Sequence, residues 1–276
     1  MRTECLLSFK DTISDINRDI TLALFINEQF ALDNAQNVSD NPNSLVREFY
    51  SHNKYRYAFN YRLDNITELI NEHLLFISRS SYVLIYTNFE LYLRNMIKLI
   101  RDITKSKPIQ GKLEIENVFL MNSSSIERNL SQEEINTLDY IRKRRNTIAH
   151  PNKKLPKELN DIITNEGANL NAYWMTQGVE LKGLDFSSHH IDVLNETMVI
   201  DIIKLLRHLA SLIDKKVLHL IDKHEIIDYL VKDFKEQFSH KVGVTPRTKL
   251  EKMFLNVAKR KIDIEAKDID FTTITF

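Results

Sequence analysis

The clearest chemical signal in this sequence lies near its middle, where Arg145, Asn146 and His150 fall within six residues and Pro151 follows directly. Arginine supplies a permanent cation whose planar set of donors matches phosphate oxygens. The imidazole of histidine can act as a general base or acid near neutral pH. Asparagine adds an uncharged donor and acceptor that can orient a substrate. Together these side chains provide what cleavage of a phosphodiester requires.

The motif is predicted to end a helix. Ser131 and Glu134 have the spacing of a capping box, in which a hydroxyl and a carboxylate bond to the exposed amides at a helix start. Pro151 cannot continue a helix, and it disfavours helical dihedral angles at the residue before it. We therefore expect a helix that begins near Ser131 and has His150 at its last turn.

One face of this helix should be apolar, and Arg145 falls on it. Leu138, Ile141 and Ile148 have helical spacing, and Arg145 comes seven residues after Leu138 and four after Ile141. A charge on such a face is costly unless it is paired or lines a cleft. We therefore expect Arg145 to face protein; the alternative is an arginine that reaches past the edge of the core to solvent.

The same spacing of arginine and histidine occurs a second time, at Arg47 and His52. This copy follows Pro42 in a broken region, has Glu48 directly after the arginine, and precedes no helix stop. An arginine followed five positions later by histidine is a weak pattern by itself, so its context decides its meaning. We interpret the later copy as the functional motif.

Composition favours a soluble, helical protein in a reducing compartment. The 276 residues include only 5 Gly and 5 Pro, too few turn residues for a many-stranded sheet protein. Lys+Arg and Asp+Glu are both 38, so the binding of a polyanion would have to be local. The single cysteine excludes an internal disulfide, and no apolar stretch is long enough to span a bilayer. We expect a cytoplasmic location and no membrane association.

Apolar residues at helical spacing predict long helices along most of the chain. The predicted helices cover residues 6–35, 61–104, 131–150, 198–212 and 225–238. Residues 154–192 are the hardest segment to assign, and the segments 179–186 and 269–276 favour strand. In the second helix, residues spaced by four and three predict a core-facing stripe: Tyr82, Tyr86, Phe89, Leu93, Met96 and Ile100.

The pattern R-N-x-x-x-H followed by Pro, on a later helix of an all-α unit, resembles the motif of the HEPN superfamily of ribonucleases and nucleotide-binding domains. The aromatic-acidic pair Phe89-Glu90 on an earlier helix resembles a second feature of that family. The resemblance covers roughly residues 60–215 and implies an all-α, HEPN-like bundle of long antiparallel helices. We expect such a domain over residues 1–218, with an extra N-terminal helix, and a small C-terminal extension over residues 219–276.

The resemblance implies metal-independent RNA cleavage without a cofactor. Arg145, Asn146 and His150 take the positions of the family's arginine, polar residue and histidine, and Glu90 is assigned as the acid that orients Arg145. Asn152 stands where family members paired with nucleotidyltransferase antitoxins often carry tyrosine, so the sequence departs from the family pattern at this position. The basic run around the motif is expected to contact RNA through Arg142, Lys143, Arg144, Lys153 and Lys154.

The resemblance also implies a homodimer with a shared active site, and a toxin or antiviral-defence effector that an antitoxin or sensor protein could control. A non-catalytic helical module that binds nucleotide, RNA or protein through the same pocket is the alternative from another class. Metal catalysis is the enzymatic alternative. It would have to use His189-His190 or the pair His219 and His224, and neither has a set of carboxylates at metal-site spacing.

Overall fold

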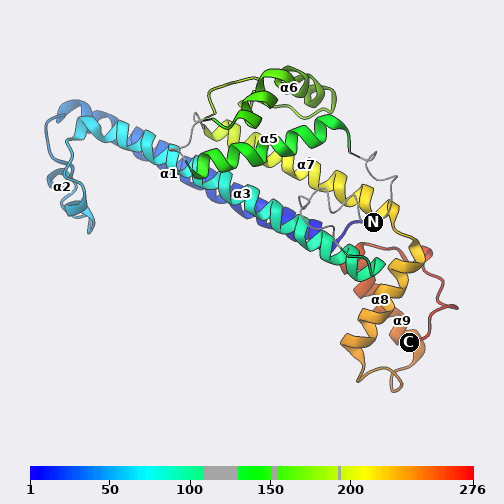
Figure 1. Cartoon of the computed structure of the whole chain (residues 1–276). Coiled ribbons are helices and arrows are strands. Elements are labelled where there is room, and N and C mark those ends of the chain that lie inside the picture. The colour runs from blue at the N-terminus through cyan, green and yellow to red at the C-terminus, as the bar shows by residue number, and fades with distance from the viewer. Residues whose placement is uncertain (108–129, 151–154, 192–193) are drawn as a thin grey trace. The chain divides into compact units, whose positions relative to one another are not determined.

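The computed structural model describes residues 1–107, 130–150, 155–191 and 194–276. In these ranges the regular structure is helical, apart from one isolated bridge between Leu45 and Arg62 (Figure 1). The all-α class is therefore confirmed, and the HEPN-like identity stays a proposal. No helix in the described part of the chain combines the length and the apolar character needed to cross a bilayer.

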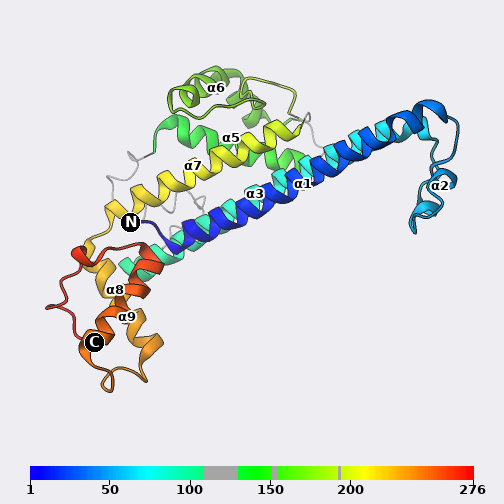
Figure 2. The same cartoon turned by 180° about the vertical axis from the view of Figure 1, so that it is seen from behind.

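The helices follow one another in the order labelled in Figure 1, and Figure 2 shows them from behind. The α-helices are α1 (Glu4–Asp40), α2 (Val46–Phe49), α3 (Ile66–Thr104), α5 (Gln132–Ala149), α6 (Lys157–Thr176), α7 (Glu196–Leu220), α8 (Lys223–Phe238) and α9 (Arg247–Ile262). Short 3-10 turns lie at η1 (Arg56–Ala58), η2 (Leu63–Asn65) and η4 (Ala266–Asp268). The five helices predicted from apolar spacing are confirmed as α1, α3, α5, α7 and α8.

The described residues group into two compact units. One unit comprises Met1–Ile13, Tyr86–Asp139 and Lys204–Phe276, and the other comprises Ser14–Ile85 and Tyr140–Ile203. The expected boundary after residue 218 falls in the last turn of α7, and it stays a prediction.

In the first unit, aromatic side chains of α1 and α3 pack against each other and bond to α7. The rings of Phe9 and Tyr92 have centroids 5.4 Å apart, and Phe9 also meets Phe89 edge to face. The hydroxyl of Tyr92 donates to the backbone oxygen of Ala210 at 2.9 Å, which satisfies a polar group that is otherwise enclosed. The predicted stripe on the second helix is confirmed as buried: Tyr82, Tyr86, Phe89, Leu93, Met96 and Ile100.

The prediction of a strand at residues 179–186 is wrong. The segment is a loop, and a buried carboxylate explains its conformation. Asp201 on α7 is 0% exposed and accepts hydrogen bonds from the backbone amides of Lys182 and Gly183, each at 2.7 Å, and of Leu184 at 3.1 Å. Because these amides bond to a side chain, they are not available to a neighbouring strand. The segment before this loop is the 20-residue helix α6, which the sequence left unassigned.

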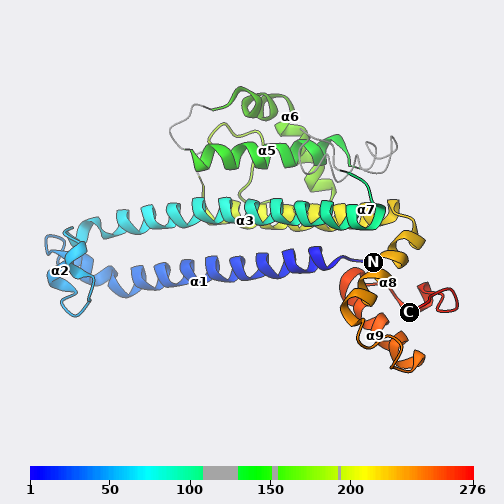
Figure 3. The same cartoon turned by 60° about the horizontal axis from the view of Figure 1, so that its bottom comes forward.

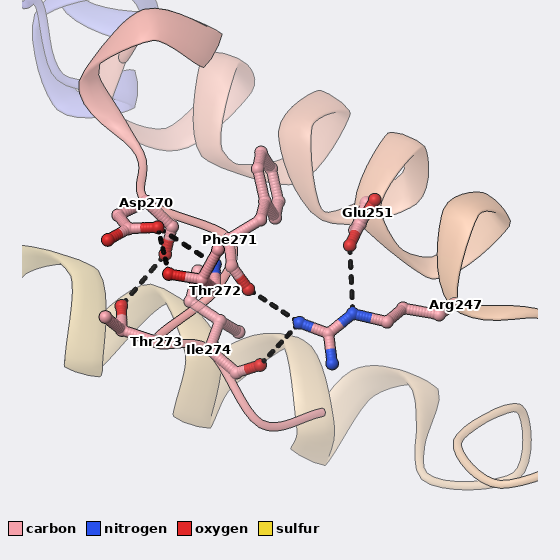
Figure 4. A network of polar contacts seen from close by, with 7 residues as sticks. All are labelled: Arg247, Glu251, Asp270, Phe271, Thr272, Thr273 and Ile274. Carbon is pink, nitrogen blue, oxygen red and sulfur yellow. Dashed lines mark hydrogen bonds and ion pairs between the residues drawn. The ribbon is translucent and has the colours of Figure 1, made fainter.

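The prediction of a strand at residues 269–276 is also wrong. A side chain of α9 binds two backbone carbonyl groups of this segment (Figure 4). Arg247 donates from Nη2 to the backbone oxygens of Phe271 at 2.6 Å and Ile274 at 3.2 Å, and from Nε to Glu251 at 3.1 Å. Asp270 accepts a hydrogen bond from the backbone amide of Thr272 and so stabilises a turn.

Phenylalanine rings hold the same last segment against α8 and α9. Phe276 packs on Phe234 and Phe254, with ring centroids 5.5 Å and 5.6 Å apart, and Phe234 meets Phe254 edge to face at 5.7 Å. Both Phe234 and Phe254 are fully buried. The helix α9 had not been predicted from the sequence, and its buried face is what closes this small core.

Candidate active site

The start of the motif helix α5 is fixed by the predicted capping box. The backbone amide of Ser131 donates to Glu134 Oε2 at 2.9 Å, and the amide of Glu134 donates to Ser131 Oγ at 3.2 Å. Lys216 on α7 donates to the same Glu134 oxygen at 3.2 Å, and Glu134 is buried. The prediction of a helix that begins here is therefore confirmed, and the cap also joins α5 to α7.

The end of α5 lies where the sequence predicts it. The helix ends at Ala149, and the backbone amide of His150 donates to the carbonyl oxygen of Thr147 at 3.2 Å, which closes the last turn. His150 is exposed. The hydroxyl of Thr147 bonds back to the carbonyl oxygen of Lys143, one turn earlier, at 3.1 Å. The helix thus presents the imidazole to solvent at its terminus.

Arg145 and Asn146 interact with each other one turn before His150. Arg145 is half-buried, and its Nη1 donates to Asn146 Oδ1 at 2.9 Å, while Asn146 itself is exposed. This bond orients the amide and leaves its nitrogen, a donor, on the exposed side chain. A guanidinium, an amide and an imidazole therefore lie within the final turns of a single helix, close to its partially negative end.

The arginine that packs in the interior is Arg144 and not Arg145. Arg144 is 1% exposed and donates from Nη1 to the hydroxyl of Tyr140 at 2.8 Å, one turn earlier. The Tyr140 ring packs edge to face against Phe186, with centroids 4.9 Å apart. Burial raises the pKa of the Tyr140 hydroxyl and the nearby Arg144 acts in the opposite direction.

The burial of Arg144 corrects two expectations. The sequence predicts an apolar stripe that runs through Arg145, but the buried positions of this helix continue from Tyr140 and Ile141 to Arg144. Arg144 was also expected to contact RNA, and a side chain that is enclosed cannot reach an external phosphate without rearrangement. Its role in this structure is to pack and bond within the protein. The sequence carries one signal for this arrangement, since a tyrosine and an arginine four residues apart lie on the same face of a helix.

Of the other predicted site residues, the structure describes three. Arg142 and Lys143 are half-buried on α5, and Glu90 is half-buried on α3. The pairing of Glu90 with Arg145 stays a prediction. Lys153 and Lys154 lie outside the described residues, as does Asn152.

The described residues contain no group of three or more histidine, cysteine, aspartate or glutamate side chains that could hold a metal ion. His189 and His190 are both exposed, in the loop after residue 186. Comparisons of the chain with protein-family models, with curated proteins and with solved structures found no match.

Proposed function

We propose that the end of α5 is the active site of a metal-independent endoribonuclease of the HEPN type. The observation that carries the proposal is the placement of Arg145, Asn146 and His150 on the final turns of one capped helix, with Asn146 and His150 exposed. The resemblance of the motif to the HEPN pattern adds the reaction class. The proposed biological role, a toxin or antiviral-defence effector with an antitoxin or sensor as partner, follows from that resemblance alone.

In the proposed reaction the 2′-hydroxyl of a ribose attacks the adjacent phosphorus. Neutral His150 accepts the hydroxyl proton as the O2′–P bond forms, and the P–O5′ bond then breaks. An imidazolium returns a proton to the leaving 5′-oxygen, so the products are a 2′,3′-cyclic phosphate and a 5′-hydroxyl. General acid-base help of this kind contributes about 10²–10⁴-fold to the rate.

Arg145 would bind the phosphate through two donors and stabilise the charge that develops on its oxygens. Asn146 would orient the scissile phosphate with its exposed amide. The half-buried Arg142 and Lys143 precede the motif on the same helix and add positive charge near the phosphate path, although the net formal charge of the chain is zero. Lys153 and Lys154 follow the motif in the sequence and are proposed as further RNA contacts.

A homodimer is the proposed active form. Arg145 and His150 are five residues apart, which corresponds to roughly 140° around an ideal helix. One copy of the motif therefore encloses a phosphate poorly, whereas a two-fold axis beside α5 would place two motifs across one cleft.

Incubation of the purified chain with RNA in EDTA tests the proposal. We expect cleavage that EDTA leaves unchanged, with products that carry 2′,3′-cyclic phosphate and 5′-hydroxyl ends. A strict requirement for magnesium or zinc would place the chemistry at a different site. RNA that is bound but not cut would instead favour the alternative, a non-catalytic helical module.

A further inference from the structure

A structured loop that contains α2, η1 and η2 joins the end of α1 to the start of α3 (Figure 3). Its base is closed by backbone hydrogen bonds from Val46 to Tyr61 at 2.8 Å and from Leu63 to Ser44 at 2.9 Å. The loop has its own small apolar core: Val46, Leu63 and Ile66 are buried, with Val38, Phe49 and Tyr50 packed against them. The chain between residues 46 and 63 is thus held in a defined conformation.

The aromatic residues of this loop fall into an inner and an outer set. In the inner set, Phe49 and Tyr50 pack edge to face at 5.1 Å, and the Tyr50 hydroxyl bonds to Asn34 at 2.5 Å. The outer set lies on the surface: Tyr55, Tyr57, Phe59 and Tyr61, of which Tyr57 is 74% and Tyr55 64% exposed. The inner pair is explained by packing in the loop core, whereas the outer four rings lie outside that core and face solvent.

Cations alternate with the outer rings. The Nζ of Lys54 lies 4.8 Å from the ring centroid of Tyr55, and the guanidinium of Arg56 lies 4.6 Å from that of Tyr57. Arg56 also donates to the Tyr57 hydroxyl at 2.8 Å and lowers its pKa. Arg62 is neutralised by Asp64 at 2.8 Å.

No acidic residue occurs between residues 49 and 63. The surface formed by Lys54, Tyr55, Arg56, Tyr57, Phe59 and Tyr61, called the loop surface below, is therefore positive within a chain of zero net charge. This local charge gives the loop a preference for an anionic ligand.

We propose that the loop surface binds single-stranded nucleic acid. Exposed rings provide flat faces on which unpaired bases stack, and interleaved cations contact the phosphates between them. Because such stacking accepts any base, the loop would hold a strand without strong sequence preference. This inference does not depend on cleavage at α5.

The chemistry of the loop favours nucleic acid over a lipid surface. Segments that insert into a bilayer surface combine basic residues with an apolar face of Trp, Phe or Leu, and the aliphatic residues of this loop, such as Val46 and Leu63, are buried in its core. Three of the four outer rings are tyrosines, whose hydroxyl groups suit a hydrated strand better than an acyl chain.

Fluorescence anisotropy of a labelled 12-nucleotide 2′-O-methyl oligouridine, titrated with the full chain at 50 mM salt, tests this inference. The probe has no free 2′-hydroxyl, so the proposed reaction cannot consume it, and the outcome is separate from that of the cleavage test. We expect Tyr55→Ala and Tyr57→Ala each to weaken binding about tenfold, and Tyr57→Phe to retain binding. Arg56→Gln should weaken binding. It should also reduce the slope of log affinity against log salt concentration by the amount expected for about one phosphate contact.

Phe76→Ala provides the matched control, since Phe76 is an aromatic side chain on α3 that is 66% exposed. It should leave the affinity unchanged. Circular dichroism should show unchanged helical content for the loop variants, whose altered rings lie outside the loop core. Oligothymidine should bind with similar affinity, which would show that stacking and charge, and not the ribose, are recognised.

Four outcomes would overturn the proposal. These are no binding by the unaltered chain at low salt, binding that Tyr57→Ala does not weaken, equal loss with Phe76→Ala, and equally tight binding of a duplex of the same length. If anionic vesicles were bound through Tyr57 while the oligonucleotides were not, the loop would be a lipid-binding site instead.

Discussion

Arg145 and His150 carry the proposed chemistry. Substituting each of them alone should remove RNA cleavage without disturbing the fold. We predict that His150→Ala and Arg145→Ala each lower RNA cleavage by at least about 10²-fold, because one removes proton transfer and the other removes charge stabilisation. Both variants should keep the helical content of the unaltered chain, since neither side chain belongs to the buried face of α5.

His240→Ala and Arg260→Ala are the matched controls, because both side chains are exposed and lie outside the motif helix. Cleavage should be measured for all four variants on the same RNA, together with far-UV circular dichroism. Equal loss of activity in the control pair, or full activity in His150→Ala, would show that α5 is not the catalytic element.

Cys5 provides a prediction for the folding of the first unit. Burial raises the pKa of its thiol from 9.0 to about 11, and the neighbouring carboxylates of Asp214 and Glu4 act in the same direction. At pH 8 the folded chain should then hold about a hundredfold less thiolate than the unfolded chain. Alkylation by iodoacetamide should be slower by a similar factor in the native protein than in urea, and equal rates would contradict this environment.

The same shift has a consequence for stability. The folded state binds this proton more tightly than the unfolded state, so the contribution of Cys5 is fully present below about pH 9 and is lost as pH rises through the window from 9 to about 11. Unfolding by urea at pH 8 and pH 10.5 should show a smaller pH-dependent loss in Cys5→Ser, which lacks a group that titrates in this window.

Among the helices, α6 gives the sharpest test of packing, at Gly167. A Cβ at this position would lie 2.6 Å from the Cα of Ser187 and 2.7 Å from the backbone oxygen of Phe186. Alanine usually stabilises a helix by about 0.5–1 kcal/mol relative to glycine. We predict the opposite sign here, with Gly167→Ala lowering the free energy of unfolding by about 1–3 kcal/mol, because backbone atoms must move.

Urea unfolding followed by circular dichroism measures this effect. Asn169→Ala, at an exposed position on the same helix, is the control and should change stability little. A Gly167→Ala variant as stable as the unaltered chain would contradict the close packing of α6 on residues 186–187. That approach matters for the candidate site because Phe186 packs on Tyr140, which in turn bonds to Arg144 beside the motif.

For the molecule as a whole, the proposed homodimer predicts how activity depends on concentration. Specific activity should fall on dilution in step with the dimer fraction measured by analytical ultracentrifugation, because each active site needs two copies of α5. Mixing Arg145→Ala with His150→Ala should restore part of the activity, since a mixed dimer has one intact arginine and one intact histidine in its shared cleft. A monomer that cleaves at undiminished specific activity would rule out this arrangement.

What the sequence determined by itself was local. Apolar residues at a spacing of three and four define α1, α3, α5, α7 and α8, because a helix face depends only on neighbours along the chain. The capping box at Ser131 and the stop before Pro151 involve partners within a few residues, so both ends of the motif helix could be predicted. The positions of Arg145, Asn146 and His150 at the end of this helix follow from those two signals.

Tertiary structure decided the features that depend on distant partners. Residues 182–184 form a loop because Asp201, from another helix, binds their amides. Residues 269–276 do not form a strand because Arg247 binds their carbonyl groups. The buried arginine is Arg144 and not its neighbour, since helical spacing allows either residue to face inward, and the bonding and packing of Tyr140 beside Phe186 select the one that does.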